Sequence, residues 1–326
     1  MAQRGNLMTV RSDVRVVDAT LRDGGLVNDF YFTDSFVNAL YRANVQAGVD
    51  YMEFGYKASK DLFDVNSFGK WKFCDEEHIR AVVGENNSDM KIAVMADVDR
   101  CNYREDIIPG DESVIDLVRV ATYIHQMPAA IRMGEDAKKK GYEVSCNIMA
   151  LSKVRESDLQ QALEMLGQSC VDVVYLVDSY GNLYPEQIRS FTDLYLEMGE
   201  KYGKKVGIHA HNNQQLAFAN TIEALARGAS YLDATMAGMG RGCGNCSMEL
   251  LLSFLKNPQY NVFPVFRFLQ NEMNPLRESG VQWGYDIPYL MTGKLNQHPS
   301  SAIRAMKEGR TDYARFYTEL MDHDTF

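Results

Sequence analysis

The stretch VRVVDATLRDGG, residues 14–25, contains the pattern that decides the fold. It starts as a short apolar, β-branched run, which is typical of a buried strand, and it ends in polar residues and two glycines. Seven similar runs follow, with helix-like stretches between them. The eight runs are VRVVDATL (14–21), YMEFGY (51–56), KIAVMADV (91–98), VIDLVRVA (114–121), EVSCNIMA (143–150), VDVVYLVD (171–178), KVGIHAH (205–211) and YLDATMAG (231–238).

The alternation of strands and helices predicts parallel βα units, and eight of them predict an α/β fold, a closed (β/α)8 TIM barrel. A doubly wound open sheet is the alternative. Helical spacing of Leu159, Leu163 and Leu166 supports the intervening helices, and Gly141 and Gly203 fall at expected helix ends. The rhythm stops after residue 256. We therefore expect a TIM-barrel catalytic domain over residues 1–256 and a small helical C-terminal extension over residues 257–326.

Composition narrows the class of protein. The 326 residues are 46% hydrophobic and 24% charged, with a formal net charge of −10 and no basic stripe, so nucleic acid is not an expected partner. No apolar run is long enough to span a membrane, and the first ten residues lack the apolar core of a signal peptide. Six cysteines in a chain of this length do not form a small disulfide scaffold, so reduced thiols and a cytoplasmic location are expected.

Polar residues gather where three of the predicted strands end. Arg22 and Asp23 precede two glycines after the first strand. They form either a solvated ion pair in a turn or a metal-binding carboxylate beside a guanidinium that holds an oxyanion. On the seventh strand, His209 and His211 are two residues apart and so face the same way, which lets both imidazoles reach one ion. The alternative is a purely structural role for both histidines in the core.

A glycine-rich loop, residues 238–246, follows the eighth strand and would let the backbone approach a ligand closely. Cys243 and Cys246 in it have the spacing of a zinc or redox pair, an interpretation weakened by the lack of a second cysteine pair. In a closed barrel the seventh, eighth and first strands are neighbours. Asp23, His209, His211 and the loop then surround one point at the C-terminal end of the barrel, where barrel enzymes place their active sites.

One carboxylate and two imidazoles leave open positions on a divalent ion, which a 2-oxo acid or its enolate could fill. The ion would polarise the carbonyl, and Arg22 would add a fixed positive charge where negative charge develops.

These residues carry a family resemblance. DATLRDGG, GIHAHNNQQLAFANTIEALARGA and LDATMAGMGRGCGN together resemble the DRE-TIM metallolyases, and residues 206–247 read most like the 4-hydroxy-2-oxovalerate aldolases among them. The resemblance implies a metal-binding lyase that makes or breaks a carbon–carbon bond beside the carbonyl of a 2-oxo acid such as pyruvate. It implies a divalent ion, with Mn²⁺ or Mg²⁺ preferred and Co²⁺ or Zn²⁺ as alternatives.

The matching motifs also imply roles for individual residues of the site. Arg22 would stabilise the enolate, Asp23, His209 and His211 would bind the metal, and Asn245 matches an asparagine ligand of some relatives. The aldolases bring a tyrosine from the extension into the site; that role falls on Tyr285 as catalytic residue, with Tyr289 as the alternate.

The resemblance also fails at specific positions. The aldolases have a histidine base three residues after the motif aspartate, where this chain has Leu26, and the synthases have an acidic residue at the position of Gly25. Cys243 is too close to Asn245 to take the role of the reactive cysteine of hydroxymethylglutaryl-CoA lyase. The base is therefore open between Tyr285, metal-bound hydroxide and His125, which could equally begin a helix.

Four functions compete. An aldolase-type lyase leads, and a Claisen condensation of an acyl-CoA with a 2-oxo acid, as in isopropylmalate and homocitrate synthases, is the alternative. Metal-dependent hydrolysis is disfavoured because barrel amidohydrolases carry their HxH on the first strand, and an inactive scaffold is motivated only by the missing base. A 2-oxo acid is the expected small-molecule partner, and a homodimer and an acylating aldehyde dehydrogenase are the protein partners considered.

Overall fold

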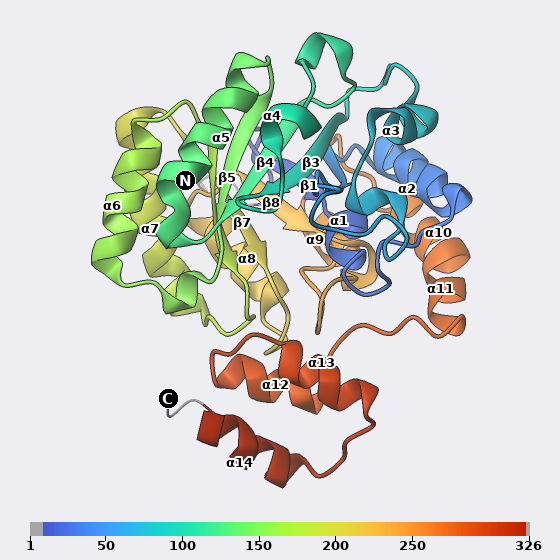
Figure 1. Ribbon diagram of the computed structural model, residues 1–326, viewed down its shortest axis with the longest axis vertical. Coiled ribbons are helices and arrows are strands. Elements are labelled where there is room, and N and C mark those ends of the chain that lie inside the picture. The colour runs from blue at the N-terminus through green and yellow to red at the C-terminus, as the bar shows by residue number, and fades with distance from the viewer. Residues whose placement is uncertain (1–8, 324–326) are drawn as a thin grey trace, which may run out of the picture.

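The computed structural model describes residues 9–323. Its eight parallel strands form a closed barrel in sequence order, each paired with the next and β8 paired with β1 (Figure 1). The predicted (β/α)8 barrel is therefore confirmed, and the open sheet is excluded. The strands are β1 (Arg15–Asp18), β2 (Tyr51–Tyr56), β3 (Lys91–Asp97), β4 (Leu117–Thr122), β5 (Glu143–Ile148), β6 (Val173–Asp178), β7 (Lys205–Ala210) and β8 (Tyr231–Ala234).

Helices surround the barrel, and the longer ones bury one face against the strands. On α6 the buried face includes Leu159, Leu163 and Leu166, as the spacing predicted. Gly203 ends α7 in the left-handed conformation, with φ of 69°. The barrel helices are α1 (Thr20–Gly24), α2 (Asp34–Ala47), α3 (Glu76–Val83), α4 (Tyr103–Asp106), α5 (Met127–Lys139), α6 (Glu156–Gly167), α7 (Pro185–Tyr202), α8 (Ala217–Arg227) and α9 (Met248–Phe254).

Two strands end three or four residues before the predicted position. β8 ends at Ala234, four residues early, and β1 ends at Asp18, so Arg22 and Asp23 lie on the short helix α1 and not at a strand end. The carboxylate of Asp18 explains the second difference. It accepts hydrogen bonds from the backbone N–H of Thr20, at 3.0 Å, and from the Thr20 hydroxyl, which turns the chain out of the strand.

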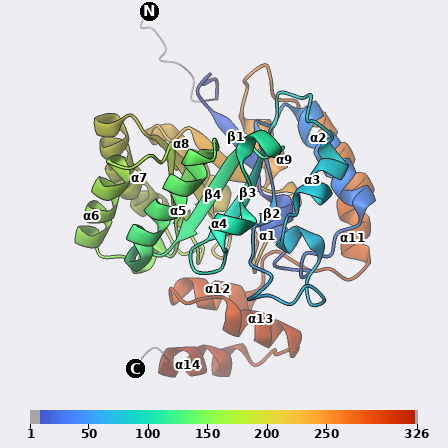
Figure 2. The same ribbon diagram turned by 45° about the horizontal axis from the view of Figure 1, so that its top comes forward.

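The C-terminal part of the chain is helical, as expected. It contains α10 (Phe263–Phe268), a π-helical turn (Leu269–Met273), α11 (Asn274–Glu278), α12 (Ile287–Lys294), α13 (Ser300–Lys307) and α14 (Tyr313–His323). α10 packs against α2 on the barrel wall. The last three helices form a separate layer across one end of the barrel (Figures 1 and 2).

This layer covers the end of the barrel at which the strands finish. Gly293 of α12 lies against Asn213, just after β7, and Asn296 exchanges hydrogen bonds with Ser152, just after β5. The division at residues 256 and 257 remains a prediction. None of the helices within residues 9–323 is both long and apolar enough to cross a membrane.

Candidate metal centre and its surroundings

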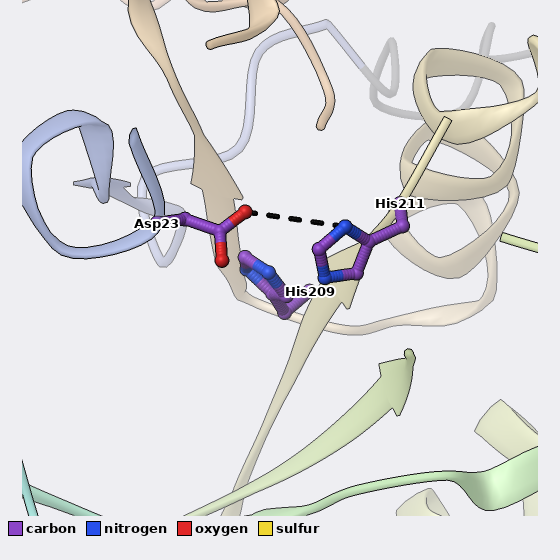
Figure 3. Close-up of side chains that lie close together, drawn as sticks. All are labelled: Asp23, His209 and His211. Atoms are coloured by element: carbon purple, nitrogen blue, oxygen red, sulfur yellow. Dashed lines mark ion pairs between the residues drawn. The ribbon is translucent and has the colours of Figure 1, made fainter. Parts of the chain in front are cut away.

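Three side chains converge where β1, β7 and β8 end. Asp23 comes from α1, His209 from β7 and His211 from the residue after β7 (Figure 3). One carboxylate oxygen and one nitrogen from each ring lie within 4.8 Å of one another, and all three residues are buried. Asp23 Oδ2 is 3.9 Å from His211 Nδ1. The structure thus brings together the three residues that the sequence predicted as metal ligands.

A hydrogen bond to the carboxylate of Asp233 orients the ring of His209. Its Nδ1 lies 2.9 Å from Oδ2 of Asp233, on β8. The carboxylate accepts the Nδ1 hydrogen, so the lone pair of the neutral ring is on Nε2. A carboxylate behind a ligating histidine is the usual arrangement at metal sites, because it fixes the tautomer and raises the basicity of the free nitrogen.

Arg22 is held between two carboxylates. Its Nη1 donates to Asp23 Oδ1 at 2.8 Å, and its Nε donates to Oε2 of Glu53, on β2, at 2.9 Å. Arg22 and Glu53 are both buried, so the guanidinium has little freedom to turn. It presents a fixed positive charge beside the cluster.

A second buried arginine closes the network inside the barrel. Arg119, on β4, donates to Glu53 Oε2 at 2.9 Å and to Asp233 Oδ2 at 2.6 Å. The ion pairs therefore run continuously from Asp23 to Asp233, whose carboxylate supports His209. The sequence analysis missed Glu53, Arg119 and Asp233. A signal was present, because each is a charged residue in the middle of an apolar strand, where burial without a partner is very costly.

Electrostatics favour the protonation states that bind a cation. Burial opposes ionisation of Asp23, but the guanidinium of Arg22 and the two imidazoles outweigh it and hold the pKa of Asp23 below its usual range. Burial lowers the pKa of His211 to about 3, against the opposing effect of Asp23. A charged carboxylate and a neutral imidazole are the forms that ligate metals.

Asn245 lies next to this cluster. Its Nδ2 donates to Asp23 Oδ2 at 2.5 Å, whereas its Oδ1 is buried and has no hydrogen-bond partner. A buried amide oxygen without a partner is costly, and a cation would satisfy it. The donor set of one carboxylate, two imidazoles and one amide oxygen thus fits a divalent ion. The role of Asn245 as a ligand stays a prediction.

The glycine-rich loop packs directly on the cluster. A Cβ atom at Gly240 would lie 2.4 Å from Asp23 Oδ2 and 2.2 Å from Asn245 Nδ2. Glycine at this position lets the backbone lie against the ligands.

Cys243 and Cys246, the cysteines of the same loop, are buried and unpaired, and burial raises the pKa of both thiols. They belong to no group of potential metal ligands within residues 9–323.

A pocket of about 490 Å³ lies between the barrel and the extension. It is bordered by Leu26, three residues after Asp23, and by Gly242 of the glycine-rich loop. Tyr285 and Tyr289 form part of its opposite wall. None of Asp23, His209 and His211 lines it, so the pocket is next to the cluster and does not contain it.

The residues predicted to transfer the proton make no hydrogen bond to the cluster of predicted metal ligands. Tyr285 is 43% exposed on the pocket wall, and no hydrogen bond joins it to the cluster. Burial raises the pKa of Tyr289 to about 12, which disfavours a phenolate there. His125 lies in the 3₁₀ turn that follows β4 and stacks on Tyr123, with ring centroids 5.9 Å apart.

Comparisons with known proteins agree with this geometry. Residues 13–264 match the model of the HMGL-like family. The chain is 30% identical over 242 residues to an oxaloacetate decarboxylase of Mycobacterium tuberculosis, covering 74% of this chain and 69% of that protein. It is 32% identical over 277 residues to a 4-hydroxy-2-oxovalerate aldolase of Thermus thermophilus, covering 83% and 78%.

Solved structures show the same fold. The N-terminal domain of a candidate aldolase from Bacteroides vulgatus superposes with a TM-score of 0.74 at 28% identity, over 90% of this chain and 96% of that one. The carboxyl transferase domain of Rhizobium etli pyruvate carboxylase superposes with a TM-score of 0.69 at 14% identity, over 93% and 54%, which shows the fold alone. The family match covers the whole barrel and every residue of the cluster, and the chain belongs to the HMGL-like family.

Proposed function

We propose that the chain binds one divalent metal ion through Asp23, His209 and His211, with Asn245 as a further ligand. With Arg22, this site stabilises the enolate of a 2-oxo acid while an adjacent carbon–carbon bond is made or broken. The observation that carries the proposal is the convergence of three buried ligand atoms within 4.8 Å, beside a guanidinium fixed by two carboxylates.

The class of reaction follows from the family. The relatives are named for aldol cleavage and for decarboxylation, and both reactions change a carbon–carbon bond of a 2-oxo acid. The chain is accordingly a metal-dependent carbon–carbon lyase, as the sequence predicted. Claisen condensation with an acyl-CoA is not favoured, because the relatives that cover most of the chain are not named for it.

A bound divalent ion supplies a Lewis acid that draws electrons from the carbonyl of the substrate. The chain's own contribution is to fix charges around that point. Arg22 faces the position where negative charge develops, and it needs little reorganisation because Glu53 and Asp23 hold its planar fork. Asp233 holds His209, and Asn245 and Gly240 shape the floor.

Proton transfer is assigned to Tyr285. Leu26 occupies the position of the aldolase histidine and lines the same pocket as Tyr285, so the extension supplies a phenol to the pocket that this histidine position borders. Its exposure leaves it free to turn toward a bound substrate, since catalytic hydrogen bonds are often long before substrate binds. Hydroxide on the bound ion is the runner-up, His125 is the third candidate, and Tyr289 is the alternate to Tyr285.

We further propose Mn²⁺ or Mg²⁺ as the ion and pyruvate as the enolate-forming part of the substrate. A mixed carboxylate, amide and imidazole set suits these ions, and Co²⁺ or Zn²⁺ would also fit. Six unpaired cysteines support a cytoplasmic location. A homodimer and an aldehyde dehydrogenase partner remain predictions.

Enolisation tests the function without knowledge of the second substrate. The protein loaded with Mn²⁺ or Mg²⁺ is mixed with pyruvate in deuterated water, and exchange of the methyl protons is followed by NMR. We expect exchange in the parent protein, with a loss of about a hundredfold or more in Tyr285→Phe. Tyr289→Phe and His125→Ala are the matched variants.

The exchange rates test the identity of the base separately from the formation of a pyruvate enolate. A similar exchange rate in all three variants would exclude these side chains as the base. The proposed metal ligands and the role of Arg22 would be unaffected by that result. Absence of exchange in the metal-loaded parent would count against a pyruvate enolate altogether.

A further inference from the structure

Arg241 is a cation at the barrel mouth without an acidic partner among the residues that the structure describes. It belongs to the glycine-rich loop after β8, and its Nη2 donates to the carbonyl oxygen of Ser179 at 3.2 Å. Its Nε is buried without a hydrogen-bond partner. Across residues 9–323, no carboxylate lies within ion-pair distance of Arg241. A partly buried guanidinium is normally paired, so this one is available to an anion.

The guanidinium lies close to the metal cluster. Arg241 follows Gly240, whose backbone touches Asp23 and Asn245. Ser179, its hydrogen-bond acceptor, follows β6, so the side chain reaches from the end of β8 across the end of β7, where His211 lies. Its charge acts on both Asp23 and His211.

His298, from the extension, faces Arg241 with the wrong polarity for a hydrogen bond. The backbone N–H of Ser300 donates to His298 Nδ1 at 3.2 Å, so the hydrogen of the neutral ring is on Nε2. Nε2 lies 3.3 Å from Arg241 Nη1. Two donors therefore face each other. An anionic oxygen beside the pair would accept from both.

The charges around the cluster also call for a second anion. The connected network contains the carboxylates of Asp23, Glu53 and Asp233 and the guanidiniums of Arg22 and Arg119, which leaves one net negative charge. A divalent ion would reverse this to one net positive charge, which one carboxylate of a 2-oxo acid would neutralise. Arg241 lies outside this network and adds a further positive charge.

We propose that Arg241 and His298 form a second anion subsite, and that the natural substrate is a 2-oxo acid carrying another anionic group, a carboxylate or a phosphate, away from its carbonyl. The proposal rests on the proposed function, which places the 2-oxo acid end at the metal. The donors of the subsite come from the loop after β8 and from the extension, so the extension takes part in choosing the substrate.

Matched ligands that differ by one charge test the subsite. Binding of 2-oxoglutarate and of 2-oxopentanoate to the Mn²⁺-loaded protein is measured by calorimetry. We expect the dicarboxylate to bind about ten- to a hundredfold more tightly, because charge-assisted hydrogen bonds contribute that much. Arg241→Gln should remove most of this ratio, Arg241→Lys should keep part of it, and Arg315→Gln, on the exposed face of α14, should leave it unchanged.

A second pair identifies the anion. The same measurement compares 2-keto-3-deoxy-6-phosphogluconate with 2-keto-3-deoxygluconate. A larger ratio for this pair assigns the subsite to phosphate, and a larger ratio for the first pair assigns it to carboxylate.

The metal content of every variant is measured alongside. If Arg241→Gln loses the ion, His298→Phe tests the same ratio from the extension. Equal binding of charged and uncharged partners by the parent in both pairs overturns the subsite but leaves the proposed function intact. Failure of all four ligands to bind overturns the subsite, and it overturns the proposed function as well only if the metal-loaded parent also shows no exchange with pyruvate.

Discussion

The two sides of the barrel mouth are built differently. Where β1, β7 and β8 end, the charged side chains are buried and joined in one network from Asp23 to Asp233. Where the extension closes the mouth, Tyr285 is 43% exposed. The extension is joined to the barrel there by separate hydrogen bonds, such as those between Asn296 and Ser152 and from Asn213 to the backbone of Tyr289. The first side is a rigid platform for a shared chemistry, and the second is a wall that can change with the substrate.

The family match follows the same division. The HMGL-like model ends at residue 264, so it includes the whole platform and leaves out α12, α13 and α14. The carbon–carbon bond chemistry therefore resides in the part of the chain that relatives share. Of the proposed second anion subsite, Arg241 lies inside the matched part and His298 beyond it.

Removal of a metal ligand should break the platform most completely. His211→Ala removes one of the three predicted ligands Asp23, His209 and His211. The metal content should therefore fall sharply, and the rate of enolisation should fall with it. The check is elemental analysis of the purified protein. His78→Ala is the matched control, because His78 lies in a surface group with Asp75 and Glu77 that could also hold an ion. Full metal content in both His209→Ala and His211→Ala would disprove the ligand assignment.

Loss of Arg119 should destabilise the barrel itself. Arg119→Met leaves Glu53 and Asp233 buried without their shared cation, which should lower the free energy of unfolding by about 3–5 kcal/mol. Urea denaturation measures the change. In the control Arg189→Met, the arginine of the lost ion pair with Glu223 is exposed and screened by solvent, so we expect little change in stability. Similar losses in the two variants would show that the network is not stabilised as described.

Substitution of Arg22 by lysine should spare the fold and the ion but impair the reaction. Lysine keeps the charge but cannot reach Asp23 and Glu53 with one planar fork. We expect a loss of about 3 kcal/mol in transition-state stabilisation, roughly a hundredfold in kcat/KM. The rate of pyruvate proton exchange provides the measurement. Near-normal turnover would rule out the role of Arg22.

Asp233→Asn should have the smallest effect of the four, because it acts on the ion only through His209. The asparagine no longer fixes the tautomer of His209 as a carboxylate does, and metal affinity should fall about ten- to a hundredfold. A competition titration with a metal-sensitive dye measures this affinity. Asp193→Asn, in an exposed ion pair with Arg227, is the control. Unchanged affinity in Asp233→Asn would mean that the ring of His209 is held by packing alone.

The sequence predicted the platform because its residues lie at fixed points of a regular pattern. Strand periodicity placed His209 and His211 on one face, and barrel closure placed Asp23 beside them. The end of β1 was wrong, because the Asp18 carboxylate turns the chain into α1, and a hydrogen bond between neighbouring residues does not change the apolar pattern.

The rest of the site depends on contacts that no periodicity encodes. Glu53, the partner of Arg22, comes from β2, and Asp233, the partner of His209, comes from β8. Arg119 on β4 joins these two carboxylates, and the pairing required the register of the closed sheet. The position of Tyr285 on a pocket wall depends on how the extension packs, and the apposition of Arg241 and His298 depends on one tautomer.

The contact between Asn245 and Asp23 joins positions 222 residues apart. During synthesis, Asp23 leaves the ribosome long before β8 and the loop that follows it. The nascent chain therefore has no complete metal site until nearly the whole barrel has emerged and its last strand has joined the first. At the proposed site, uptake of the ion would then mark the end of barrel folding, and a truncated chain would carry the DATLRDGG motif without the other proposed ligands.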